Sequence, residues 1–151
     1  MDEVKRTGVI GLGAMGLQMA RHMAAKGFDV EGHDIDAEAM KRAQAVGLRT
    51  ASADDVGRHA EVVIVMVATD AQVREVVSGL VQSLTAGAVI CIASSVSPDT
   101  CRELAVLAAV RGVGVLDTPV VLGQEAANNG DRKSTRLNSS HIQKSRMPSS
   151  A

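Results

Sequence analysis

Aromatic residues are almost absent from this 151-residue chain, which has no tryptophan, no tyrosine and one phenylalanine, Phe28. Without aromatic rings and with no basic patch in its main body, the chain offers no platform on which nucleic-acid bases could stack. Nucleic acid is therefore not expected as a partner. Hydrophobic residues still make up 46% of the sequence, so valine, alanine, leucine and isoleucine must fill the interior. The length corresponds to one domain with a sizeable core.

Cysteine and long apolar runs are also scarce. The two cysteines, Cys91 and Cys101, have neither C-x-x-C nor zinc-type spacing, so we expect two reduced thiols and no bound metal. No apolar run has the length of a membrane span, and the start Met1-Asp2-Glu3 does not resemble a secretory signal. The sequence therefore predicts a cytoplasmic protein with no membrane partner.

Charge is unevenly distributed, although the formal net charge is only −1. Residues 131–151 hold five basic residues and one acidic residue, which leaves residues 1–130 with 11 basic and 16 acidic residues. A basic tail can indicate nucleic-acid binding, but the acidic main body does not support that interpretation.

The strongest motif is Gly11-Leu12-Gly13-Ala14-Met15-Gly16, which follows the short apolar run Gly8-Val9-Ile10. A strand that leads into G-x-G-x-x-G and then a helix is typical of a dinucleotide-binding unit. Gly11 allows the tight turn, Gly13 lets a pyrophosphate approach the backbone, and Gly16 lets the helix pack closely. The phosphates would sit at the helix N-terminus, where N–H groups and the helix dipole favour negative charge.

Asp34 follows the expected second strand, 18 residues after Gly16. A carboxylate at this spacing can accept hydrogen bonds from the 2′-hydroxyl of an adenosine ribose. It would repel a 2′-phosphate, and the next residue, Ile35, has no guanidinium to receive one, so the sequence favours NAD over NADP. The alternative is that Asp34 is a surface turn residue. His33 is interpreted as a neighbour of the adenosine pocket or an exposed residue, not as a catalyst.

Apolar runs and helical spacings alternate along the rest of the chain. The run from Glu61 to Val67 is rich in β-branched residues, which predicts a strand covered on both faces, as in a parallel sheet. The expected strands are 7–10, 28–33, 48–51, 61–67, 88–93 and 113–116, and the expected helices are 14–26, 36–45, 53–59, 70–77 and 97–110. This order predicts an α/β fold, a doubly wound and mainly parallel sheet with its ligand at the carboxyl ends of the strands.

Four stretches together resemble one enzyme family. They are Gly11-Leu12-Gly13-Ala14-Met15-Gly16-Leu17-Gln18-Met19-Ala20, Met66-Val67-Ala68-Thr69-Asp70, Ser94-Ser95-Val96-Ser97-Pro98 and Asp117-Thr118-Pro119-Val120. The first is similar to the extended fingerprint G-L-G-x-M-G-x-x-M-A of the β-hydroxyacid dehydrogenases, the family of 3-hydroxyisobutyrate dehydrogenase and 6-phosphogluconate dehydrogenase. The second lies where that family has a cofactor-contacting loop, and the third resembles its segment near the nicotinamide.

The resemblance implies a Rossmann-type NAD-binding domain over residues 1–130 and an NAD-dependent oxidoreductase that transfers hydride between a small hydroxy acid and nicotinamide. It also implies that the full-length enzyme is a homo-oligomer. The cofactor-binding residues it implies are Gly11, Leu12, Gly13, Ala14, Met15, Gly16, Asp34, Met66, Val67, Ala68, Ser94 and Ser95.

The residues that follow Asp117-Thr118-Pro119-Val120, where the family contacts its substrate, depart from the family pattern. Val121 and Leu122 replace the Ser-Gly pair that binds the substrate carboxylate in the family, and Gly123 fits the pattern. Either the substrate differs from the usual small hydroxy acids, or Gln124 and Asn128 supply the polar contacts.

A sharper break comes at Asp131, after which the chain is polar and without periodicity. Residues 131–151 resemble the in-frame translation of a widely used sequencing adapter, so we expect a disordered, artefactual tail on a fragment that stops before the helical C-terminal domain of the family. The lysine that serves the family as general acid and base would lie beyond this point. Lys133 and Lys144 do not stand where the family has this lysine in the order of its motifs. The chain itself is therefore expected to be inactive. The alternative function is a non-catalytic dinucleotide-binding or interaction module on the same fold.

Overall fold

The computed structural model describes residues 5–120, which form one six-stranded parallel sheet with five helices. The sheet order is β3-β2-β1-β4-β5-β6, and each neighbouring pair is parallel. The strands are β1 (Arg6–Ile10), β2 (Asp29–His33), β3 (Arg49–Thr50), β4 (Val62–Val65), β5 (Val89–Ile92) and β6 (Gly114–Asp117). The helices are α1 (Ala14–Ala25), α2 (Ala37–Ala45), α3 (Ala53–His59), α4 (Asp70–Ser83) and α5 (Pro98–Ala109). The predicted doubly wound α/β fold is confirmed.

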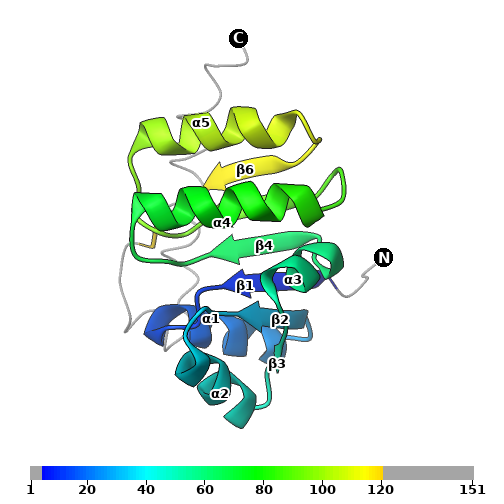
Figure 1. Cartoon of the computed structure of the whole chain (residues 1–151). Helices are drawn as coiled ribbons and strands as arrows, with labels where there is room; N and C mark the ends of the chain where they lie inside the picture. The colour runs from blue at the N-terminus through cyan, green and yellow to red at the C-terminus, as the bar shows by residue number, and fades with distance from the viewer. Residues whose placement is uncertain (1–4, 121–151) are drawn as a thin grey trace.

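The helices cover opposite faces of the two halves of the sheet. Crossovers between parallel strands are right-handed, so the direction in which the chain moves across the sheet decides which face a helix covers. From β1 to β3 the chain moves one way, and α1 and α2 pack on one face against Val9 and Val30. From β4 to β6 it moves the other way, and α4 and α5 pack on the opposite face, as Figure 1 shows.

The larger of the two apolar clusters lies under α3, α4 and α5. Its strand residues include Val63 and Val65 of β4 and Ile90 and Ile92 of β5, all fully buried. Burying one such side chain contributes roughly 1.5–3 kcal/mol, so this cluster anchors the half of the sheet that carries the loops after β4 and β5.

Among residues 5–120, the strand predicted at 61–67 is fully buried on one face and half-buried on the other. Burial alternates along β4, where Val63 and Val65 are buried and Val62 and Ile64 are only half-buried. On β6 of the same half-sheet, Leu116 is 40% exposed. Helices α3, α4 and α5 pack against Val63 and Val65, and the face of Val62 and Ile64 is less completely covered by the described residues.

Side chains cap four of the five described helices. Asp36, Ser52, Thr69 and Ser97 each accept a hydrogen bond from a backbone N–H in the first turn of α2, α3, α4 and α5, as their residue types predict. Helix α1 begins after Gly13 with no side-chain cap. Within residues 5–120, none of the helices is long and apolar enough to cross a membrane.

Candidate functional site

The carboxyl ends of the parallel strands lie at one edge of the sheet, and the strand order reverses there between β1 and β4. In open α/β sheets a ligand binds in the crevice beside such a reversal. The loops after β1, β2, β4 and β5 surround this point, and together with the first turn of α1 they contain the twelve cofactor-binding residues predicted from the sequence.

The three glycines after β1 are required for two different reasons. Gly11 has a φ of 102°, and a Cβ there would overlap the carbonyl oxygen of Met66. A Cβ on Gly16 would overlap the carbonyl oxygen of Gly11, so Gly16 packs against the turn itself. A Cβ on Gly13 would meet no heavy atom within 4 Å. Gly11 and Gly16 therefore serve the fold, whereas Gly13 leaves open space in front of α1.

The start of α1 supplies hydrogen-bond donors to that open space. The first N–H groups of a helix have no partner within the helix, and no side chain caps α1. Gly13 and Ala14 are exposed, and Met15 is half-buried. An anion here would meet backbone N–H groups and the positive end of the helix dipole. The turn therefore fits a pyrophosphate.

Asp34 connects the end of β2 to the glycine turn. Its Oδ2 accepts the N–H of Leu12 at 2.7 Å, and its Oδ1 accepts the N–H of Asp36 at 2.9 Å. The Gly11 N–H donates to the carbonyl of His33 at 2.9 Å, which ties the same two segments together. Asp34 is thus both the turn residue of the alternative interpretation and a neighbour of the phosphate turn. Each carboxylate oxygen keeps a lone pair for a further donor.

Leu12 contributes its backbone and not its side chain to this edge. The side chain is fully buried, and a Cβ on Gly32 of β2 would lie 3.0 Å from the Leu12 methyl carbons. His33 likewise has a structural contact, since its Nδ1 lies 2.9 Å from the carbonyl oxygen of Ala51. A carbonyl oxygen only accepts, so this nitrogen carries the proton in the bond.

Each backbone N–H group of the loop after β4, residues 66–69, donates a hydrogen bond. Met66 donates to the carbonyl of Ile10 at 2.8 Å, and Val67 donates to the Ser94 hydroxyl oxygen at 2.8 Å. Ala68 and Thr69 both donate to Oε1 of Gln72, at 2.9 and 3.1 Å. This loop is therefore fixed against β1, the end of β5 and α4 before any ligand binds.

Ser94 and Ser95 differ in their surroundings. Ser94 is 3% exposed, and its hydroxyl also lies 3.4 Å from the carbonyl oxygen of Val65, to which it donates. Ser95 is exposed. A direct cofactor contact by either residue stays a prediction, but the Ser94 hydroxyl already braces the loop after β4.

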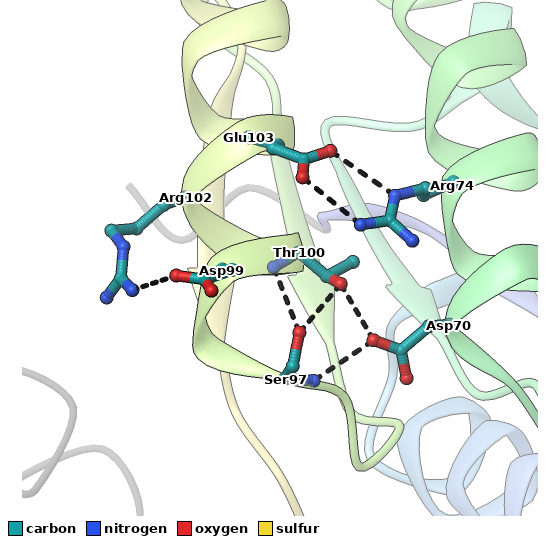
Figure 2. Close-up of polar contacts among 7 residues, drawn as sticks. All are labelled: Asp70, Arg74, Ser97, Asp99, Thr100, Arg102 and Glu103. Atoms are coloured by element: carbon teal, nitrogen blue, oxygen red, sulfur yellow. Dashed lines mark hydrogen bonds and ion pairs between the residues drawn. The ribbon is translucent and has the colours of Figure 1, made fainter.

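The site residues predicted from the sequence did not include Gln72, Thr100 or Asp70, although Asp70 ends the stretch that resembles the cofactor-contacting loop. The spacing Thr69-Asp70-Ala71-Gln72 is that of a capping box, and both of its hydrogen bonds are present. That spacing could have pointed to Gln72. No local signal predicts the partners of Asp70, whose Oδ2 accepts from Thr100 Oγ1 at 2.7 Å and from the Ser97 N–H at 3.1 Å (Figure 2). These two donors, Thr100 first, hold the pKa of Asp70 below its ordinary value.

The remaining predicted site residues, Val121, Leu122 and Gly123, lie outside the described residues. The chain reaches that segment from the end of β6, where Thr118 donates its N–H to the carbonyl of Ile92 at 2.8 Å. Within the part of the chain that the structure describes, no group of three or more His, Cys, Asp or Glu side chains could hold a metal ion.

The reversal of strand order, the glycine turn at an uncapped helix start and the acidic residue after β2 define a dinucleotide-binding domain of the Rossmann type. Residues 6–133 match the family described as the NAD binding domain of 6-phosphogluconate dehydrogenase. The chain belongs to that family.

The curated relatives of this chain include dehydrogenases. The chain is 31% identical over 131 residues to an L-threonate dehydrogenase of Cupriavidus necator, and the match covers 84% of this chain and 44% of the relative. It is 30% identical over 128 residues to the mitochondrial 3-hydroxyisobutyrate dehydrogenase of Homo sapiens, with 82% and 38% covered. The chain thus spans less than half the length of these relatives.

Solved structures of similar fold cover the same part of the chain. A 3-hydroxyisobutyrate dehydrogenase of Mycobacterium tuberculosis with L-serine superposes with a TM-score of 0.81 at 29% identity, over 84% of this chain and 44% of that one. A protein named Psf3, in complex with NADP+ and 2-OPP, superposes with a TM-score of 0.75 at 28% identity, over 82% and 45%.

Proposed function

We propose that residues 1–130 are the cofactor-binding part of an NAD-dependent 3-hydroxyacid dehydrogenase of the 3-hydroxyisobutyrate dehydrogenase type. The observation that carries this proposal is the open space at Gly13 in front of α1, the one described helix that no side chain caps. The curated relatives that are dehydrogenases of small hydroxy acids support the choice of reaction class.

In this proposal the pyrophosphate binds at Gly13 and the first turn of α1, where no side chain caps the helix and a Cβ on Gly13 would meet no heavy atom within 4 Å. Asp34 accepts a hydrogen bond from the ribose hydroxyls of the adenosine half. Ile35, whose side chain is 90% exposed beside it, supplies apolar surface and no positive charge. The nicotinamide half extends past Gly11 and Met66 toward the loops after β4 and β5.

The bound cofactor supplies hydride transfer to or from the alcohol carbon of a small hydroxy acid. The described residues of this chain bind and orient it, and Val121, Leu122 and Gly123 are proposed to contact the substrate. The family's general acid and base is a lysine, and the sequence has no lysine between Lys41 and Lys133. The 151-residue chain is therefore proposed to bind cofactor without turnover. A homo-oligomeric full-length enzyme and a cytoplasmic location stay predictions.

The preference for NAD over NADP depends on Asp34. A 2′-phosphate beside this carboxylate would meet like charge, and both oxygens of Asp34 already hold backbone N–H groups that fix the carboxylate in place. The similarity to a protein complexed with NADP+ makes this the property that most needs a direct test.

The test compares NADH and NADPH binding to the wild-type chain and to Asp34→Asn by titration of the nicotinamide fluorescence. The asparagine keeps an acceptor oxygen toward Leu12 and removes the charge, so damage to the turn weakens both cofactors equally and drops out of their ratio. We expect the NADH-to-NADPH preference to fall by about tenfold, which corresponds to about 1.4 kcal/mol. An unchanged ratio would refute the ribose role of Asp34, and wild-type chain that binds neither cofactor would refute the proposed function.

A further inference from the structure

The first residue of α4 and the start of α5 are joined by one carboxylate oxygen. Asp70 Oδ2 accepts from the Ser97 N–H at 3.1 Å and from the Thr100 hydroxyl at 2.7 Å, across 27 and 30 residues of chain. Figure 2 shows the Asp70 carboxylate reaching from α4 toward both groups at the start of α5.

The direction of each hydrogen bond in this cluster follows from its chemistry. An ionised carboxylate only accepts, so the Thr100 hydroxyl donates to Asp70. The Ser97 hydroxyl therefore donates to Thr100 Oγ1, 2.9 Å away, and accepts the Thr100 N–H at 3.2 Å. Thr100 is 1% exposed with Asp70 in place, so loss of Asp70 would remove the acceptor that the Thr100 hydroxyl uses in this cluster.

This cluster closes a ring that contains both ligand loops. At one end Val67 donates its N–H to Ser94, and at the other end Ser97 donates its N–H to Asp70. Residues 94–97 are thus attached at both ends to residues 67–70. Since those attachments come from the loop after β4 and from the first residue of α4, the segment after β5 cannot shift without breaking one of these hydrogen bonds.

A second contact between α4 and α5 does not explain the position of the loop. Arg74 forms a two-pronged ion pair with Glu103, with Nε–Oε2 and Nη2–Oε1 distances of 3.3 and 3.2 Å. The side chains are 44% and 60% exposed, and exposed ion pairs hold geometry weakly. This pair lies further along both helices, away from Ser97 (Figure 2).

The geometry points to Asp70 and Thr100 as positioning residues that hold residues 94–97 ready for the nicotinamide half of the cofactor. This inference rests on the proposed function. The strand order supports the assignment to that half, because β2 with Asp34 lies on one side of β1 and the strands β4 and β5 lie on the other. The adenosine half therefore does not touch the Asp70 cluster.

The experiment measures how tightly two ligands bind to the wild type and to four variants of the full 151-residue chain. NADH contains both halves of the cofactor, and ADP-ribose lacks the nicotinamide ring. The variants are Asp70→Ala, Asp70→Asn, Thr100→Val and the control Asp99→Ala. Asp99 lies beside Thr100 in the first turn of α5, but it pairs with Arg102 on the side away from α4.

We expect Asp70→Ala and Thr100→Val to weaken the binding of NADH by about tenfold. The affinity for ADP-ribose should stay within about twofold of the wild-type value. Asp70→Asn keeps one oxygen that can accept both hydrogen bonds, so it should restore NADH binding, and Asp99→Ala should bind both ligands like the wild type. Equal losses for the two ligands, or no loss of NADH, would overturn the inference, because a general loss of stability affects both halves.

Amide hydrogen exchange tests the contact without a ligand. The Ser97 N–H should exchange faster in Asp70→Ala than in the wild type and in Asp99→Ala. Unchanged exchange would show that Asp70 does not hold the Ser97 N–H. If the wild-type chain bound neither NADH nor ADP-ribose, the proposed function would fail and the cofactor role of Asp70 with it. The exchange result separates that failure from a wrong assignment of the contact.

Discussion

Replacing Gly13 with valine should separate cofactor binding from folding. Gly13 has φ −70° and ψ −167°, a conformation that valine adopts freely, and its Cβ would meet no heavy atom within 4 Å. The new side chain would instead occupy the space in front of α1 where the pyrophosphate is proposed to bind. The variant should therefore fold and fail to bind.

The expected magnitudes follow from this geometry. A pyrophosphate needs N–H···O distances of about 2.9 Å, and each hydrogen bond to a charged group contributes about 1.5–3 kcal/mol. Losing two of these hydrogen bonds should weaken the binding of NADH by more than about a hundredfold. A poorer N-cap costs up to about 1 kcal/mol, and the less flexible unfolded chain returns about 0.4–1 kcal/mol. Thermal unfolding should therefore shift by less than about 5 °C.

Two other glycines provide the controls. Gly79 in α4 also has open space at its Cβ position but lies within the helix, so Gly79→Val should bind NADH like the wild type. Gly16→Ala would force a methyl group against the Gly11 carbonyl oxygen. It should lower both affinity and stability, the latter by about 2–4 kcal/mol.

Titration of NADH fluorescence and thermal unfolding by circular dichroism measure both properties on the same samples. Wild-type affinity in Gly13→Val would refute the placement of the pyrophosphate. A loss of stability in Gly13→Val as large as that in Gly16→Ala would refute the reasoning from open space.

Three further predictions concern the rest of the chain. Deleting residues 131–151 should leave thermal unfolding unchanged within error, and a drop of many degrees would contradict the interpretation of that segment as an artefactual tail. The folded-state pKa of Asp70 is depressed by Thr100 and Ser97, so its contribution to stability is complete above its unfolded pKa of about 3.9 and is lost as the pH falls through the folded value. Urea unfolding below about pH 4 should therefore be less pH-dependent in Asp70→Asn than in the wild type, and parallel curves would refute this. Burial raises the pKa of the Cys91 thiol, so its alkylation by iodoacetamide at neutral pH should be slower than that of free cysteine; an equal rate would show that the strand is not protected.

Much of the fold could be predicted because its signals are local. The helix starts at Ser52, Thr69 and Ser97 follow from side chains that reach a backbone N–H only two or three residues away. The turns after α1 and α2 follow from Gly27 and Gly47, which have φ values of 97° and 88° that other residues rarely adopt. The boundaries were less exact, since the strand expected at 48–51 is only Arg49–Thr50.

The coverage of the sheet could not be read from composition. The β-branched run after Glu61 predicts burial on both faces, but the face that a helix covers depends on the direction in which the chain crosses the sheet. That direction is set by which strands pair, and pairing joins residues such as Val63 and Ile90 that lie far apart in the sequence.

The sequence by itself determined the alternation of strands and helices, the glycine turn and the position of an acidic residue after the second strand. It determined them because backbone dihedral preferences, helix capping and side-chain periodicity act over a few residues. Only the tertiary structure decided that Asp34 holds the N–H of Leu12, that Ser94 braces Val67 and that Asp70 fixes the start of α5. Each of these contacts joins segments 22 to 27 residues apart, and they meet only because parallel pairing brings the carboxyl ends of β1, β2, β4 and β5 to one edge of the sheet.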